Sequence, residues 1–87
     1  MNARLRYIFN VRADRLADAI NAMTARPDFH TIEHLKGSRI EIVPVSGDLT
    51  PMITWDVDSS MDYACEDTIA CLTADGVING LTTKRRI

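Results

Sequence analysis

Apolar and polar side chains alternate in two stretches of this sequence, residues 4–9 and residues 52–58. Alternation with a period of two is typical of a β-strand that buries one of its faces. The apolar side chains are Leu5, Tyr7 and Phe9 in the first stretch, and Ile53, Trp55 and Val57 in the second. The pattern therefore predicts two strands that contribute to one core.

Two other stretches repeat their apolar residues at helical spacing, which predicts amphipathic helices. In residues 11–25 the apolar stripe consists of Ala13, Leu16, Ala17, Ile20 and Met23. Pro27 ends this helix, because a proline disfavours helical geometry in the residue before it. The second helix starts at Ser59 or Ser60 and stops near Gly76. Its apolar stripe consists of Met61, Cys65, Thr68, Ile69 and Leu72.

The residues between the first helix and the second alternation predict a β-hairpin. Residues 31–36 and 39–45 flank Gly37-Ser38, and glycine at the first loop position fits a two-residue type II′ turn. Residues 46–51, SGDLTP, have the composition of a loop. The last residues leave two alternatives open: a small hairpin around Asn79-Gly80, or a final edge strand.

These elements predict a single α+β domain over residues 1–87. Their order is strand, helix, strand, strand, strand, helix and an optional last strand. An antiparallel sheet of four to five strands with both helices on one face buries the two stripes and the alternating strand faces together. This arrangement resembles a ferredoxin-like fold with an extra strand, a resemblance of architecture that implies no function.

The composition predicts a cytoplasmic protein. No apolar run approaches the length of a membrane-spanning helix, so no membrane is expected as a partner. On a helix, the six-residue separation of Cys65 and Cys71 places them about 9 Å apart along the axis, which is too far for a disulfide. Two free thiols agree with a reducing compartment.

The distribution of charge is more informative than the net charge of −2. Residues 48–83 contain seven acids and no base, and five of these acids fall within residues 55–67. Such a one-signed segment attracts a basic partner, such as the surface of a nucleic-acid-binding protein. The predicted partner-binding residues are the acids of this stretch and two nearby candidates for apolar anchors: Asp56, Asp58, Asp62, Glu66, Asp67, Met52 and Tyr63.

Two spacings in the sequence partly match metal sites, but simpler interpretations explain both. The acids from Asp56 to Asp67 partly match a calcium-binding loop, but Met61 stands where that loop needs glycine for its sharp turn. His30 and His34 have the spacing of a helical metal pair, yet they fall in a predicted loop and strand. No metal and no cofactor are therefore expected.

The sequence contains no nucleophile motif and no glycine-rich phosphate loop, so a non-enzymatic function is expected. The preferred interpretation is a protein-binding module that docks on a basic surface through its acidic patch. In its size, acidity and lack of motifs the chain resembles phage-encoded inhibitors of the anti-CRISPR type. The alternatives are a ligand-binding regulatory domain that dimerises through its sheet, and a nucleic-acid binder that uses the arginines of residues 4–9 with Lys84, Arg85 and Arg86. The isoelectric point near 5.5 argues against nucleic acid.

Overall fold

The computed structural model of the chain contains one antiparallel sheet and two helices, and it describes residues 3–27, 29, 35, 37–80 and 82–87. The strands are β1 (Arg4–Asn10), β2 (Arg39–Val45), β3 (Asp48–Asp58) and β4 (Thr83–Arg86). The helices are α1 (Leu16–Thr24) and α2 (Asp62–Ala74), each preceded by a 3-10 turn, at Ala13–Arg15 and Ser59–Met61. The predicted α+β class is confirmed.

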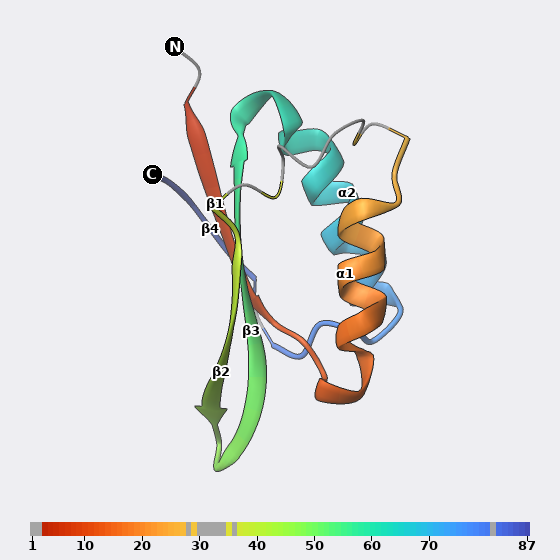
Figure 1. The fold of residues 1–87 in the computed structure, drawn as a ribbon, viewed down its shortest axis with the longest axis vertical. Helices are drawn as coiled ribbons and strands as arrows, with labels where there is room; N and C mark the ends of the chain where they lie inside the picture. Colours follow the sequence, from red (N-terminus) through yellow and green to blue (C-terminus); the bar gives the residue numbers. More distant parts are fainter. Residues whose placement is uncertain (1–2, 28, 30–34, 36, 81) are drawn as a thin grey trace.

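The four strands lie in the order β2-β3-β1-β4, and all neighbours are antiparallel. Both helices cover one face of this sheet, as Figure 1 shows, so the predicted two-layer arrangement is confirmed. Within the described residues the other face carries no helix, and we call it the open face. The predicted final edge strand is also present, as β4, which pairs with β1.

The core lies between the helices and the two central strands. The register pairs Tyr7 with Trp55. The same face of the sheet carries the pairs Leu5 with Val57 and Phe9 with Ile53. All six are buried. The Trp55 ring lies 6.4 Å from the ring of Tyr7 and 5.9 Å from that of Phe29, which packs edge-on. Both strands were therefore predicted with the correct inward faces.

The apolar stripe of α2 was predicted correctly, whereas that of α1 was predicted correctly only in part. Four of the five stripe residues of α2 are buried, and Met61 packs against the core from the preceding turn. In α1 the buried residues are Ala19 and Met23, while Ala17 and Ile20 are exposed. Leu16 packs against the core as predicted, and Ala13 lies in the 3-10 turn before α1, which begins only at Leu16.

The hairpin that contains β2 differs from the predicted one. Strand β2 pairs with β3, and Ser46-Gly47 forms the two-residue turn between them. Both turn residues have positive φ, 50° and 89°, as a type I′ turn requires. The predicted loop over residues 46–51 is therefore a tight turn followed by the first residues of β3. The predicted strand at residues 31–36 lies almost entirely outside the described residues.

Candidate functional site

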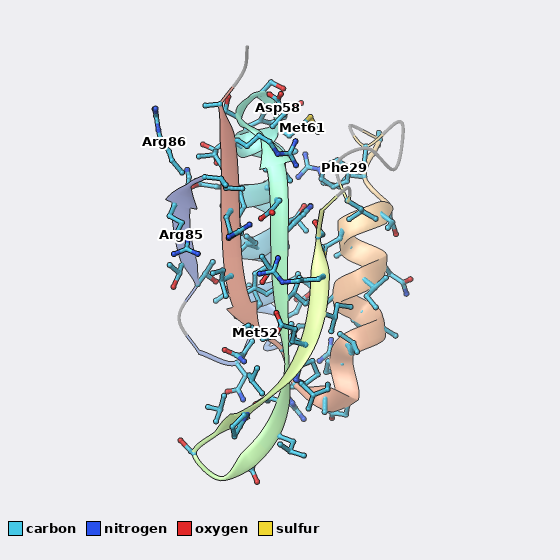
Figure 2. All side chains as sticks on the ribbon, turned by 60° about the vertical axis from the view of Figure 1, so that its left-hand side comes forward. Phe29, Met52, Asp58, Met61, Arg85 and Arg86 are labelled. Atoms are coloured by element: carbon cyan, nitrogen blue, oxygen red, sulfur yellow. The ribbon has the colours of Figure 1, made fainter. Side chains whose placement is uncertain are left out.

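The seven predicted partner-binding residues do not share one surface. Met52, Asp56 and Asp58 belong to β3, and the strand register places them on the open face. Figure 2 shows that Met52 and Asp58 are far apart along this strand. The other four lie on α2, which covers the opposite face: Asp62, Tyr63, Glu66 and Asp67. The structure therefore divides the acidic patch between two sides of the sheet.

On the open face, Asp56 is enclosed by basic residues. Arg6 donates two hydrogen bonds to its carboxylate, at 2.8 and 2.9 Å, and Arg4 donates one to its backbone carbonyl at 3.2 Å. The hydrogen bond from Arg6 lowers the pKa of Asp56, and the Asp56 side chain is only 10% exposed. Asp58 accepts a hydrogen bond from the backbone N–H of Ser60. These acids therefore have structural roles.

On the helical side, bases from distant parts of the chain reach the acids of α2. The ammonium group of Lys84, on β4, lies 2.8 Å from Asp62 and 2.7 Å from Glu66, and these bonds raise the pKa of Lys84. The hydroxyl of Tyr7 donates to Asp62, and Arg26 forms an ion pair with Asp67. Four acids of the segment, Asp56, Asp62, Glu66 and Asp67, are therefore paired with bases that lie outside it.

An exposed part of the acidic patch nevertheless remains on α2. Tyr63, Glu66 and Asp67 are spaced i, i+3 and i+4, so they share one side of the helix. All three are exposed, and the side chains of Glu66 and Asp67 stay more than half accessible within their ion pairs. This group is the portion of the predicted docking surface that a partner can reach.

The basic residues of the first and last strands do not form one patch either. Strands β1 and β4 are neighbours, and the register places Arg6 beside Arg85 on the open face. Lys84 and Arg86 alternate with Arg85 and point to the other side of the sheet, and Figure 2 shows Arg85 and Arg86 diverging. Since Asp56 also lies on the open face, that face carries both signs of charge.

The most unusual surface of the molecule is apolar and lies at the far end of the β2–β3 hairpin. We call residues 39–51, which comprise β2, the turn and the first residues of β3, the hairpin arm. Figure 1 shows that the arm extends beyond the helices, and the molecule is correspondingly elongated, at 41 × 25 × 19 Å. Ile42 is 60% exposed and Leu49 is 70% exposed.

Most exposed apolar residues of the arm are grouped on one side, whereas Val45, which pairs with Asp48, lies on the open face. Strand alternation and register place Ile40, Ile42, Pro44 and Leu49 on the side of the sheet that bears the helices. Ile40 lies near α1, whereas Ile42, Pro44 and Leu49 lie closer to the tip of the arm. Ile20 on α1 is exposed and joins Ile40 at the edge of a cavity. We call these five residues the apolar arm face. The sequence did not reveal it, because residues 46–51 have a loop composition.

A cavity of about 300 Å³ lies between α1 and the sheet, beside the apolar arm face. Its walls are mainly apolar, with a few polar side chains among them. The residues that line it are Ile20, Met23, Thr24, Leu35, Ser38, Arg39, Ile40 and Ile53. It has the size and character of a small-ligand site at the lower end of the usual range.

Both cysteines are free, as predicted, and they have different environments. Cys65 is buried, and burial raises its pKa to about 12, whereas Cys71 is exposed. The described residues contain no group of three or more His, Cys, Asp or Glu side chains able to hold a metal ion. His30 and His34 lie outside that part of the chain. Neither helix in the described ranges has the length and apolarity that a membrane crossing requires.

Comparisons with known proteins identify the fold alone. No protein-family model and no curated protein matches this sequence. Among solved structures, the chain is similar to a dimeric ferredoxin-like protein of unknown function from Thermobifida fusca YX. The TM-score is 0.58 at 18% identity, over all of this chain and 93% of the other. The chain has a ferredoxin-like α+β fold. The ferredoxin-like resemblance inferred from the order of elements is therefore confirmed.

Proposed function

We propose that this protein is a small, non-enzymatic binding domain that works as a homodimer, in which the apolar arm faces of two copies pack against each other. The observation that carries this proposal is the projection of the hairpin arm, with Ile42 and Leu49 mostly exposed beyond the helical layer. An exposed apolar group of this kind is typical of an interaction site. Burying an isoleucine or leucine side chain is worth about 1.5–3 kcal/mol.

A second copy of the chain is a suitable partner for this surface. A twofold axis brings the same patch of both copies together, so each arm covers the apolar residues of the other. The solved structure that this chain resembles is described as dimeric, which supports a dimeric state for this chain. The arm also carries few charges on this side, so packing two copies together desolvates mainly apolar atoms.

The prolines of the hairpin favour packing through side chains over a continuous intermolecular sheet. Pro51 has no N–H, so Pro51 and its partner Ile42 form a pair without hydrogen bonds between their backbones. The N–H and C=O of Ile42 therefore point away from β3, toward the outer edge of β2. Pro44 lies two residues further along β2, so its backbone also points toward the outer edge, but a proline has no N–H to donate there. The edge of β2 is therefore a poor template for strand addition.

Analytical ultracentrifugation over a dilution series tests this proposal. We expect a concentration-dependent dimer for the wild type and a monomer for the double variant Ile42→Ser, Leu49→Ser. The matched control is Tyr63→Ser, Ile87→Ser, which removes two apolar side chains of similar exposure away from the arm and should remain dimeric. A wild type that stays monomeric at all concentrations, or a dimer that survives the arm substitutions, would refute the proposal.

Docking on a basic partner remains a second candidate function, now limited to Tyr63, Glu66 and Asp67. Their shared exposed side of α2 combines an aromatic anchor with two carboxylates. A nona-arginine peptide is a simple probe of this surface, and its affinity is measured by fluorescence anisotropy. We expect Tyr63→Ala with Glu66→Lys and Asp67→Lys to weaken binding about tenfold, equivalent to about 1.4 kcal/mol.

The control for this experiment makes the same change of net charge on another surface. Asp14 and Asp18 are exposed acids that also form ion pairs with arginines, and they lie at the start of α1. If Asp14→Lys, Asp18→Lys weakens peptide binding as much as the α2 substitutions do, the binding reflects overall charge. In that case α2 has no specific docking surface.

A further inference from the structure

The cavity between α1 and the sheet has walls that attract apolar molecules. Its deeper wall includes Met23 and Ile53, which are almost fully buried, and its edge includes Ile20 and Ile40, which are partly exposed. Protein interiors are normally packed without voids of this size, because unfilled apolar space forfeits contacts. An apolar hollow that opens to the surface is therefore a candidate for a bound molecule.

The polar side chains around the cavity already have partners in the protein. The hydroxyl of Thr24 donates to backbone carbonyls of its own helix, and Ser38 accepts a hydrogen bond from the backbone N–H of Asp56. Arg39 donates to Glu41 at 3.0 Å. An ordered water needs two to four polar partners, so the water inside this cavity is poorly held. Replacing poorly held water with an apolar molecule is favourable.

We infer that this cavity binds a small, uncharged, largely apolar molecule, such as a compact aromatic ring system. Its volume of about 300 Å³ corresponds to roughly ten water-sized atoms, at about 30 Å³ each. The ligand's apolar body contacts Met23, Leu35 and Ile53. A charged ligand is disfavoured here, because the guanidinium of Arg39 is paired with Glu41 and, among the described residues, Arg39 is the one ionisable side chain that lines the cavity.

This inference goes beyond the proposed dimer and does not depend on it. Ile20 and Ile40 belong to both the cavity and the apolar arm face, whereas Ile42 and Leu49 do not line the cavity. The variant Ile42→Ser, Leu49→Ser therefore separates the two proposals, because it disrupts the arm face and leaves the cavity wall intact. Ligand binding is measured in the wild type and in this variant.

Titration with indole, followed by NMR of isoleucine, leucine and methionine methyl groups, tests the inference. Indole is compact, neutral and mostly apolar, with nine carbon or nitrogen atoms. We expect saturable shifts of the methyl groups of Met23, Ile20 and Ile53, with a dissociation constant of about 1 mM or below. Methyl groups remote from the cavity, such as that of Ile87, should not shift.

The variant Ile20→Trp supplies the decisive comparison. Ile20 lies at the edge of the cavity and is partly exposed, so a larger side chain fills the opening without entering the core. We expect at least about tenfold weaker indole binding, while Ala17→Trp, an exposed position on the same helix that does not line the cavity, retains the wild-type affinity.

Three results would overturn the inference. The first is the absence of saturable shifts at the lining methyl groups. The second is a set of shifts centred on Ile42 and Leu49, which would place indole on the arm face. The third is equal binding by Ile20→Trp and the wild type, each with a native methyl spectrum.

Discussion

Strand β3 passes through two environments, and the contrast between its two ends explains much of this molecule. Its second half, around Trp55, is buried between β1 and β2 and under the helices. Its first half belongs to the hairpin arm, where Leu49 is largely exposed. Apolar residues at one end stabilise the fold, whereas those at the other end remain available for contacts with another molecule.

The largest expected effect concerns the buried end of β3. Replacing Trp55 with alanine removes the side chain that packs against Tyr7 and Phe29, and we expect a loss of about 3–5 kcal/mol in the free energy of unfolding. Urea denaturation followed by circular dichroism measures this change. A loss below about 1 kcal/mol would mean that the core is not centred on this ring.

A smaller effect is expected for the ion pair on the open face. Asp56→Asn keeps the shape of the side chain but removes the charge that Arg6 binds, and at neutral pH it should cost about 1–3 kcal/mol. Because the folded pKa of Asp56 lies below its ordinary value of 3.8, the stabilisation is complete above that value. It is then lost as the pH falls through the folded pKa.

Denaturation curves of the wild type and Asp56→Asn at several pH values measure this dependence. The difference between the two proteins should be constant near neutral pH and should shrink below about pH 4. The matched control is Glu41→Gln, which breaks the exposed pair with Arg39 and should cost no more than about 0.5 kcal/mol. Equal losses for the two variants would contradict a special role of Asp56.

The turn at the tip of the arm gives an intermediate test, since it contributes to the hairpin without touching the core. Gly47 has φ of 89°, and apart from Gly47 and its two chain neighbours no described residue has an atom within 4 Å of the position that a Cβ would occupy. Gly47→Ala should therefore cost about 1–2 kcal/mol through backbone strain alone. Ser46→Asn should be neutral or stabilising, because Asn-Gly is the preferred type I′ pair. Thermal denaturation compares the two variants, and a higher melting temperature for Gly47→Ala than for Ser46→Asn would exclude this turn type.

The smallest effect on unfolding is expected at the exposed end of β3. Leu49→Ala should change the unfolding free energy of the monomer by less than about 0.5 kcal/mol, because its side chain makes few contacts within its own chain. Denaturation at a concentration low enough to keep the protein monomeric measures this. A loss comparable to that of Trp55→Ala would show that the arm residue is part of the core and would remove the basis of the dimer proposal.

Several elements were predictable because their signal is local. The alternation around Tyr7 and Trp55 and the stripe of α2 depend only on which residues follow one another, and burial follows directly from that periodicity. The start of α1 was less predictable. A 3-10 turn at Ala13–Arg15 delays the helix to Leu16, and the sequence contains no strong signal for this turn.

The hairpin illustrates a limit of local reasoning. Gly37-Ser38 and Ser46-Gly47 both satisfy the requirements of a two-residue turn, and strand β2 follows the first and precedes the second. Which of these turns joins two paired strands depends on which strand lies beside β2 in the folded sheet. There it pairs with β3, whose other edge is occupied by β1.

The sequence by itself determined the two-layer architecture, the inward faces of β1 and β3, and the excess of acids after residue 47. Only the tertiary structure decided what those acids do, because the bases that bind them come from distant positions, Arg6, Arg26 and Lys84. It also decided that the hairpin arm extends beyond the helices. Periodicity is a property of neighbouring residues, whereas ion pairing and exposure depend on where distant segments meet in space.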